Sequence, residues 1–309
     1  MVTPLPASGT QKQGWPWTTE ELKHNLPEIL PKEKKWPKIT IVTPSYNQAL
    51  FLEETIRSVL LQGYPNLEYI IMDGGSTDGS VKIIQRYSSF ITSWVSQPDK
   101  GQSDALNRGF QKSTGEILAW LNSDDIFLPG TLHQVGAYFA NHSEIDVIYG
   151  NAILTDETSR PIGAVRSVPF NARAYIFNTV PIPAQSAVFW RRELFLKVGM
   201  LNEALNFSMD AELIAKFIDA QAKFAFLHVT FGTYRDHTLS KSLGAGGQNQ
   251  KGIPESYFIP QFAIRRHPLY PLLRIPFRLR QWGWLALQGD VPYLISRLIT
   301  RVNRRSAAS

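Results

Sequence analysis

The stretch ITIVTPSYN, residues 39–47, decides the fold of this chain. A β-branched run ends in a proline and then in polar residues, as a buried parallel strand does where it reaches the edge of its sheet. Apolar residues at helical spacing alternate downstream with further short apolar runs. They predict helices over residues 52–60, 81–87 and 102–112, and strands over residues 67–72, 91–96 and 116–121. This alternation predicts an α/β fold with a mostly parallel sheet and right-handed crossovers.

Polar or acidic residues follow several of these strands at the point where each strand ends. They occupy residues 44–47 (PSYN), 73–75 (DGG), 98–101 (PDKG) and 122–125 (NSDD). The ligand crevice of a parallel sheet lies beyond the carboxyl ends of its strands, so we interpret these clusters as one site. Carboxylates and carbonyls suit hard cations such as Mg²⁺ or Mn²⁺, which usually complete their coordination with substrate phosphates. The sequence therefore predicts a carboxylate-rich site for a metal ion and a phosphorylated ligand.

Motifs of other enzyme classes are absent from the sequence. There is no G-x-x-x-x-G-K-[ST] phosphate loop, no G-x-G-x-x-G after the first strand, no G-x-S-x-G elbow and no H-E-x-x-H pair. The chain has no cysteine, which excludes disulfides and thiolate–metal sites. These absences leave the carboxylate-rich crevice as the feature that carries the chemistry.

Four ordered segments resemble the successive motifs of glycosyltransferase family 2, whose members are inverting nucleotide-sugar transferases with the GT-A fold. The segments are residues 41–47, 70–79, 99–109 and 120–125, and the similarity extends over about residues 38–240. The resemblance implies a GT-A domain, with a Rossmann-like, mostly parallel sheet flanked by helices, over residues 38–240. Composition predicts an N-terminal extended arm over residues 1–37, with Trp15 and Trp17 pinning it to the domain. It also predicts a C-terminal basic amphipathic helical tail over residues 241–309.

The resemblance implies a role for each matching position of the nucleotide site. Pro44 and Tyr46 would wall the base, Asp73 would hydrogen-bond it, and residues 99–108 would line the ribose and the diphosphate. The implied nucleotide-binding residues are Pro44, Tyr46, Asn47, Asp73, Gly75, Asp99, Gly101, Asp104, Arg108, Asn122 and Ser123.

The resemblance also implies a metal ion and a catalytic base. Asp124 matches the ligand of a divalent ion (Mn or Mg) in the D-x-D motif, but Asn122 replaces the first acid, so we expect weaker metal binding. His237 matches a histidine that reaches the metal or the phosphates, although an ordinary hydrogen bond to a neighbour is the alternative. Asp210 matches the general base at a helix start, where the ionised form is favoured and where Ser208 could cap the helix.

The activity implied is metal-dependent, inverting, hexosyltransferase-like transfer from a nucleoside diphosphate sugar, with UDP-sugars favoured, to a hydroxyl acceptor. The acceptor would be a carbohydrate or a lipid-linked sugar, in cell-surface polysaccharide or glycolipid synthesis. Asp210 would activate the acceptor, while the ion, His237 and either Arg108 or Arg235 would stabilise the departing diphosphate. Two other classes stay open. A catalytically inactive GT-A scaffold or carbohydrate-binding protein would explain Asn122, whereas a sugar nucleotidyltransferase would need a glycine-rich basic first loop, which residues 44–48 lack.

The positive charge of the chain is concentrated in its last part. Residues 265–309 hold nine arginines and one acid, a net charge of +8, which leaves −2 for the remainder of a chain whose total is +6. A nucleic-acid partner is therefore not predicted. Without a signal sequence or a stretch approaching ~20 apolar residues, we expect a cytoplasmic protein. Residues 291–302 predict an amphipathic helix with arginines opposite its apolar face, preceded by Trp282 and Trp284. It would either dock on the inner, anionic surface of the membrane or pack on the domain.

Overall fold

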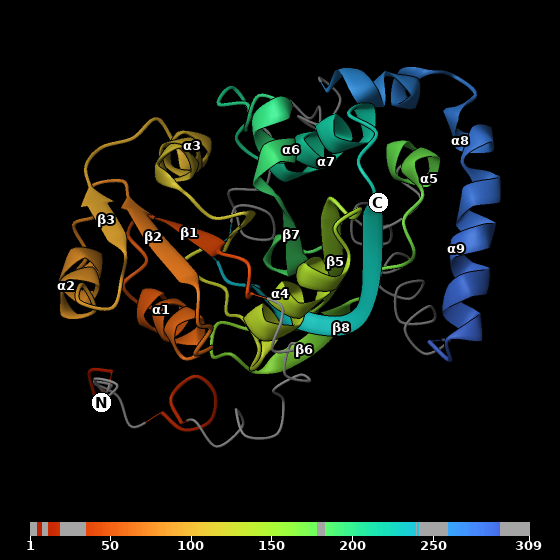
Figure 1. Cartoon of the computed structure of the whole chain (residues 1–309). Helices are drawn as coiled ribbons and strands as arrows, with labels where there is room; N and C mark the ends of the chain where they lie inside the picture. The colour runs from red at the N-terminus through yellow and green to blue at the C-terminus, as the bar shows by residue number, and fades with distance from the viewer. Residues whose placement is uncertain are drawn as a thin grey trace.

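The computed structural model of this chain describes residues 5–7, 12–18, 35–177, 183–238, 240 and 259–290. At their centre lies one eight-stranded sheet, in which the order β3-β2-β1-β4-β7-β5-β6 is completed by β8, which pairs with β5 (Figure 1). The strands are β1 (Ile39–Ser45), β2 (Leu67–Asp73), β3 (Ser93–Ser96), β4 (Ile117–Trp120), β5 (Val147–Thr155), β6 (Pro161–Val165), β7 (Val188–Arg191) and β8 (Phe224–Arg235).

The first four strands form a parallel half-sheet, as the alternation of strands and helices predicts. β1 pairs in parallel with both β2 and β4, and β2 pairs in parallel with β3. In the other half, β7 runs antiparallel to β4 and β5, β6 runs antiparallel to β5, and β8 runs parallel to β5. The parallel half therefore brings the ends of β1, β2 and β4 to one edge, where the predicted polar clusters begin.

Helices cover both faces of the sheet, which explains why β1 is buried along its whole length. Ile41 packs with one face and its neighbour Val42 with the other, because successive side chains of a strand point to opposite sides. On the Ile41 face lie α1 (Leu52–Leu60), α2 (Ser80–Arg86) and α4 (Thr131–Asn141). On the Val42 face lie α3 (Gln102–Lys112), α5 (Ala172–Ile176), α6 (Arg192–Lys197) and α7 (Met209–Asp219).

Both ends of the chain are described in part. In the N-terminal arm, Trp15 Nε1 donates to the carbonyl oxygen of Phe127 over 2.7 Å, and Arg57 Nε donates to the carbonyl of Pro16 over 3.1 Å. These contacts support the interpretation of Trp15 as an anchor of the arm. Towards the C-terminus, a 3₁₀ segment (Pro260–Arg266) leads into α8 (Tyr270–Leu273) and α9 (Ile275–Leu287). The helix predicted over residues 291–302 lies outside the described residues.

Candidate active site

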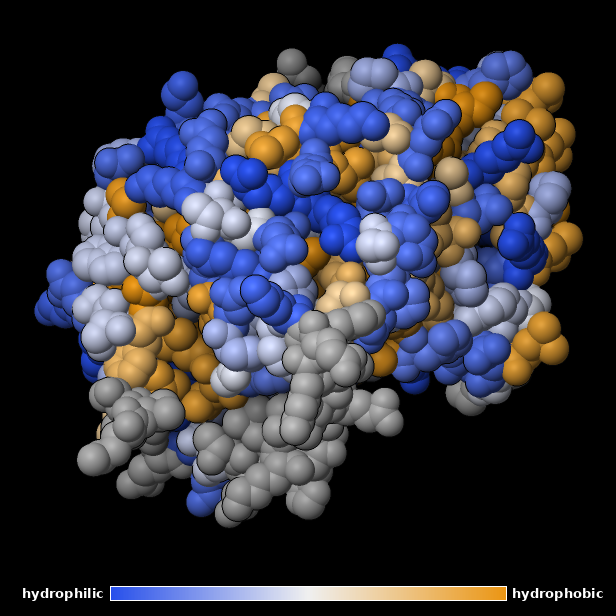
Figure 2. Space-filling model, viewed as in Figure 1, coloured by the Kyte–Doolittle hydropathy of each residue, from blue (hydrophilic) through white to orange (hydrophobic). Residues whose placement is uncertain are grey.

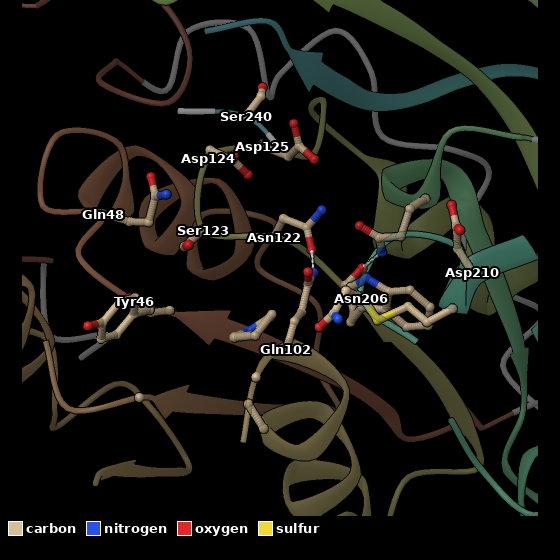
Figure 3. A pocket seen from close by; sticks show the side chains of 18 of the residues that line it. Tyr46, Gln48, Gln102, Asn122, Ser123, Asp124, Asp125, Asn206, Asp210 and Ser240 are labelled. Atoms are coloured by element: carbon tan, nitrogen blue, oxygen red, sulfur yellow. Dashed lines mark hydrogen bonds between the residues drawn. The ribbon is translucent and has the colours of Figure 1, made fainter. Parts of the chain in front are cut away.

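A cavity of about 1010 Å³ opens at the carboxyl ends of β1 and β4. Figure 3 shows Tyr46 and Gln48 on one side of the cavity, residues 122–125 in the middle, and Asn206 with Asp210 on the other side. Of the predicted site residues, those that line the cavity are Pro44, Tyr46, Asn47, Gly75, Asp99, Gly101, Asn122, Ser123, Asp124 and Asp210. Asp73, Asp104, Arg108 and His237 lie around it but do not line it.

The loop after β1 forms one wall of the cavity. Tyr46 is 63% exposed, so its ring presents a free face to the cavity. Asn47 adopts a left-handed backbone conformation with φ 52°, which asparagine tolerates better than most residues. Its N–H donates to Ser76 Oγ over 2.8 Å, and its Oδ1 accepts from Thr77 N over 2.9 Å. Asn47 therefore clamps the loop after β1 to the loop after β2 and fixes where Tyr46 stands.

Asp73 is the last residue of β2 and is 2% exposed. Its carboxylate accepts hydrogen bonds from the loop that follows the strand. Its Oδ2 accepts from Gly75 N, Ser76 N and Ser96 Oγ at 3.1, 2.9 and 2.7 Å, and its Oδ1 accepts from Ser76 Oγ at 2.5 Å. The role predicted for Asp73, a hydrogen bond to the base, stays a prediction. In this structure its oxygens hold the turn in which Gly75 has φ 84°.

Residues 99–108 divide between the cavity and its surroundings. Asp99 lines the cavity and its Oδ1 accepts from Gly101 N over 2.8 Å. Gly74 approaches it so closely that an added Cβ would lie 2.7 Å from Asp99 Oδ2. Asp104 accepts from Lys100 N over 2.9 Å and forms an ion pair with Arg108 over 2.7 Å. Arg108 is thus held on α3, and in this structure its guanidinium does not line the cavity.

Asn122, which replaces the first acid of the expected metal motif, is part of a hydrogen-bonded relay. Its Oδ1 accepts from Gln102 Nε2 over 2.8 Å, and its side chain also hydrogen-bonds Asp125 (Figure 3 shows the first contact). Gln102 is the first residue of α3, so this relay links the start of α3 to the loop after β4. An amide can donate and accept at once, which an ionised aspartate at position 122 could not do.

Asp124 and His237 meet at the rim of the cavity, although they are 113 positions apart in the sequence. His237 Nε2 lies 3.0 Å from Asp124 Oδ2, and the two side chains are 2% and 21% exposed respectively. The ring of His237 also packs against Phe51, with the ring centroids 4.7 Å apart. His237 does not line the cavity and is connected to it through Asp124, so the metal-binding role that the resemblance implied for these two residues stays a prediction.

Arg235 and Asp125 form a buried framework behind Asp124 that sequence reasoning missed. Asp125 is 2% exposed, and burial together with the neighbouring Asp124 carboxylate raises its pKa well above the ordinary value. Asp125 Oδ1 accepts from Arg235 N over 2.9 Å, and Arg235 Nε donates to the carbonyl of Asp124 over 2.6 Å. The guanidinium also pairs with Glu54 over 3.0 Å, so in this structure it holds the protein framework together, and its predicted contact with a departing phosphate stays a prediction.

Asp210 is the second residue of α7 and lines the cavity. Its Oδ1 accepts from Ala211 N over 2.7 Å, which orients the carboxylate at the N-terminus of the helix. The capping by Ser208 that the sequence indicated is wrong: Ser208 is the N-cap residue, but its side chain makes no capping hydrogen bond. Gln185 lines the cavity as well, whereas Trp190 is 1% exposed and packs in the core.

The charges of the lining fit a cation better than a free anion. Among the described residues that line the cavity there are four carboxylates (Asp99, Asp124, Asp125 and Asp210) and one cationic side chain, Arg235, which is engaged elsewhere. The described residues form no cluster of three or more His, Asp or Glu side chains suited to a metal. Asp124 and His237 nevertheless supply one carboxylate and one imidazole. This set suits a divalent ion that takes its remaining ligands from substrate phosphates and water.

Comparisons with solved structures identify the fold. S. aureus TarS 1-349 in complex with UDP matches with a TM-score of 0.54 at 19% identity, covering 64% of this chain and 60% of that chain. The mannosyltransferase PcManGT from Pyrobaculum calidifontis, in complex with GDP-Man and Mn²⁺, matches with a TM-score of 0.54 at 16% identity, covering 93% of this chain and 86% of that one. The GT-A fold expected from the sequence is confirmed.

Comparisons of sequence identify relatives. An uncharacterized glycosyltransferase of Nostoc sp. is 30% identical over 170 residues, which span 52% of this chain and about half (53%) of that protein. A PGL/p-HBAD biosynthesis glycosyltransferase of Mycobacterium tuberculosis is 28% identical over 205 residues, 65% of this chain and 77% of that protein. The family model described as Glycosyl transferase family 2 matches residues 40–199, more than half of the chain. With this match, and with the motif order and fold described above, the chain belongs to glycosyltransferase family 2.

Proposed function

We propose that this chain is a metal-dependent, inverting glycosyltransferase that moves a sugar from a nucleoside diphosphate sugar, with UDP-sugars favoured, to a hydroxyl group of a carbohydrate or lipid-linked acceptor. The observation that carries this proposal is the order of groups along the cavity. Tyr46 stands on one side, Asp124 in the middle and Asp210 on the opposite side (Figure 3). A donor laid along this line would place its base by Tyr46, its diphosphate by Asp124 and its sugar towards Asp210.

We propose Asp210 as the general base. In a single displacement, the acceptor oxygen forms a bond to the anomeric carbon while the bond from that carbon to the diphosphate oxygen breaks on the opposite side of the sugar. The acceptor loses its proton to a carboxylate in the same step. Asp210 lines the cavity on the side away from Tyr46, and its Oδ1 is oriented by Ala211 N. Its position supports attack from the side opposite the diphosphate, which inverts the anomeric configuration.

The diphosphate side of the cavity depends on Asp124, His237 and the polar groups of Asn122 and Ser123. A divalent ion held by Asp124 and His237 would neutralise the charge that develops on the departing diphosphate. Among the described lining residues, the one cationic side chain, Arg235, is already paired with Glu54. The positive charge that neutralises the diphosphate would therefore come from the ion. Asn122 holds Gln102 and Asp125 in place around the same region.

The test is calorimetric titration of the folded protein with UDP, GDP and dTDP, each with Mn²⁺ and again with a chelator. Binding of one of them that is lost on chelation supports the proposal and identifies the base. If the folded protein binds none of the three, the proposal is wrong. Donors that carry the preferred base are then tested for release of nucleoside diphosphate. Binding without any release, with or without candidate acceptors, would favour a catalytically inactive protein that keeps the fold.

A further inference from the structure

The outer face of α9 is apolar, although α9 lies at the surface. Ile275, Leu279 and Trp282 follow one another at helical spacing and are 47%, 60% and 39% exposed. Leu287, at the end of the helix, is 86% exposed. A helix on the surface of a globular protein normally turns its polar face to water and its apolar face to the core. Packing in the core therefore does not explain why these exposed residues are apolar.

The inner face of α9 already provides the contacts that hold it to the domain. Leu285 is 1% exposed, and Trp284 packs edge-on against Phe226 with ring centroids 5.7 Å apart. Phe277 stacks on Phe177 with ring centroids 5.2 Å apart. The helix is therefore apolar on two opposite sides, and packing on the domain accounts for one of them.

The preceding segment extends the outer stripe. Leu269, Leu272 and Leu273 are 53%, 63% and 41% exposed. Figure 2 shows apolar residues along the right-hand edge of the molecule, where α8 and α9 lie in Figure 1, interspersed with strongly hydrophilic residues. We call the set of Leu269, Leu272, Ile275, Leu279 and Trp282 the outer stripe.

The charge around the outer stripe is mostly positive. Residues 259–290 contain five arginines and one acid, Asp290, which lies close to Arg166. Arg278 and Arg280 lie on either side of the stripe by helical spacing, at positions between the outer and inner faces. An apolar stripe flanked by arginines is the arrangement of helices that lie in the interface of a membrane. Their apolar side chains insert beside the headgroups, and their cations contact lipid phosphates.

We propose that the outer stripe of α8 and α9 docks on an anionic lipid surface, with the axis of α9 in the plane of the membrane. A helix of 13 residues is about 20 Å long and cannot cross a hydrocarbon core of about 30 Å, so it lies on the bilayer. None of the helices in the described parts of the chain has the length and apolar character needed to span a bilayer. A second copy of the chain fits the stripe less well, because the arginines of the two copies would face each other and outnumber the one nearby acid, Asp290, which lies close to Arg166.

Docking in this way would bring the lipid surface near one side of the cavity. Asp290, which follows α9, lies 3.8 Å from the guanidinium of Arg166, and the neighbouring Val165 lines the cavity. If the transferase activity proposed above is correct, this arrangement suits an acceptor that is itself anchored in the membrane. The docking surface does not depend on that activity, and its test is separate.

The experiment is cosedimentation of the full chain with vesicles of phosphatidylcholine, and with vesicles that contain about a quarter phosphatidylglycerol. We expect binding to the anionic vesicles at low salt, weaker binding at high salt, and little binding to phosphatidylcholine alone. The double variant Leu279→Ser with Trp282→Ser should weaken binding to anionic vesicles about tenfold or more. Arg280→Gln should weaken it about fivefold.

Matched controls use exposed residues elsewhere on the surface. Leu196→Ser removes a leucine of α6 that is 44% exposed, and Lys112→Gln removes an exposed cation at the end of α3; both should bind vesicles as the parental chain does. Thermal melting and nucleotide titration of every variant separate docking from folding and from the proposed activity.

The proposal is overturned if the chain does not bind anionic vesicles at low salt. It is also overturned if the outer-stripe variants bind as tightly as the controls, which would assign binding to another segment such as residues 291–309. A dimer that the same variants dissociate, with vesicle binding unchanged, would make a second copy the occupant and overturn it as well.

Discussion

Arg235 of β8 donates from Nη2 to Oε2 of Glu54 on α1 over 3.0 Å, with the two side chains only 1% and 3% exposed. The same guanidinium donates from Nε to the carbonyl of Asp124 and from Nη1 to Ser159 Oγ over 2.8 Å. Its backbone N–H donates to Asp125 Oδ1. One buried ion pair therefore fixes the segment that carries the predicted metal ligand, and it joins α1, the loop after β4, the β5–β6 turn and β8.

Breaking this pair should loosen the site as well as the fold. Glu54→Gln leaves the Arg235 guanidinium buried without its counter-charge, so we expect the free energy of unfolding to fall by about 3 kcal/mol. Glu53→Gln is the matched control, because Glu53 is the next residue of the same helix and pairs with Arg86, which is 39% exposed. Loss of the Glu53–Arg86 pair should lower the free energy of unfolding by about 1 kcal/mol or less. Urea denaturation measures both, and equal stability of the two variants would contradict the role assigned to Glu54.

Asp210→Asn should remove turnover and keep the nucleotide. The amide cannot take the acceptor proton, so we expect the rate of transfer to fall by a factor of about 10²–10⁴. Because Asp210 lies on the side of the cavity away from Tyr46, the affinity for the nucleoside diphosphate should change little. Asp219→Asn, at the other end of α7, is the control: its Oδ2 accepts from Gln261, outside the cavity. Equal rates for the two variants would remove Asp210 from the mechanism.

Asn122→Asp tests whether the amide weakens metal binding. A second carboxylate beside Asp124 supplies another anionic ligand, so we expect the affinity for Mn²⁺ to rise by about tenfold. Without metal the same change places a third acid beside Asp124 and the buried Asp125 and removes the amide donor to Asp125, so the melting temperature should fall. Calorimetry and melting with and without Mn²⁺ measure both effects. The control is Asn206→Asp, which adds the same charge to the same cavity from the loop before α7. An equal rise in Mn²⁺ affinity in this variant would show that added negative charge, and not coordination by residue 122, causes the effect.

Local patterns predicted much of the parallel half of the sheet. Residues 102–112 coincide with α3, because apolar residues at helical spacing follow Gly101, whose φ of 115° suits a glycine before the helix start. The spacing of Asp104 and Arg108 on that helix, four residues apart, also favours the ion pair that keeps Arg108 out of the cavity. This signal was present in the sequence, but the resemblance directed the interpretation towards phosphate binding.

Contacts between distant segments could not be predicted in the same way. Glu54 and Arg235 are 181 positions apart, and neither position carries a pattern that names its partner. The pairing of β8 with β5 also joins segments that are far apart in the sequence, with shifts in its register. Such contacts depend on the whole packed chain, so sequence patterns indicated Asp124 and Asp210 as candidate site residues but not the buried framework behind Asp124.

Glu68 should make the stability of the fold depend on acid pH. Burial raises the pKa of Glu68, but hydrogen bonds from Thr40, Thr114 and Lys38 outweigh it and lower the pKa to about 2, from an ordinary value of 4.5. A carboxylate whose pKa is lower in the folded state contributes stability above its unfolded pKa and loses it as the pH falls through the folded value. Glu68→Gln should therefore lower the free energy of unfolding by roughly 2 kcal/mol at pH 7, because the amide cannot replace charged hydrogen bonds. The difference from the parental chain should shrink between about pH 5 and pH 2, as denaturation at several pH values would measure. The control is Glu193→Gln, which removes an exposed carboxylate on α6 and should change neither the stability at pH 7 nor its dependence on pH. If the loss of stability in Glu68→Gln stayed constant down to pH 2, the hydrogen bonds to Glu68 would not depend on its charge.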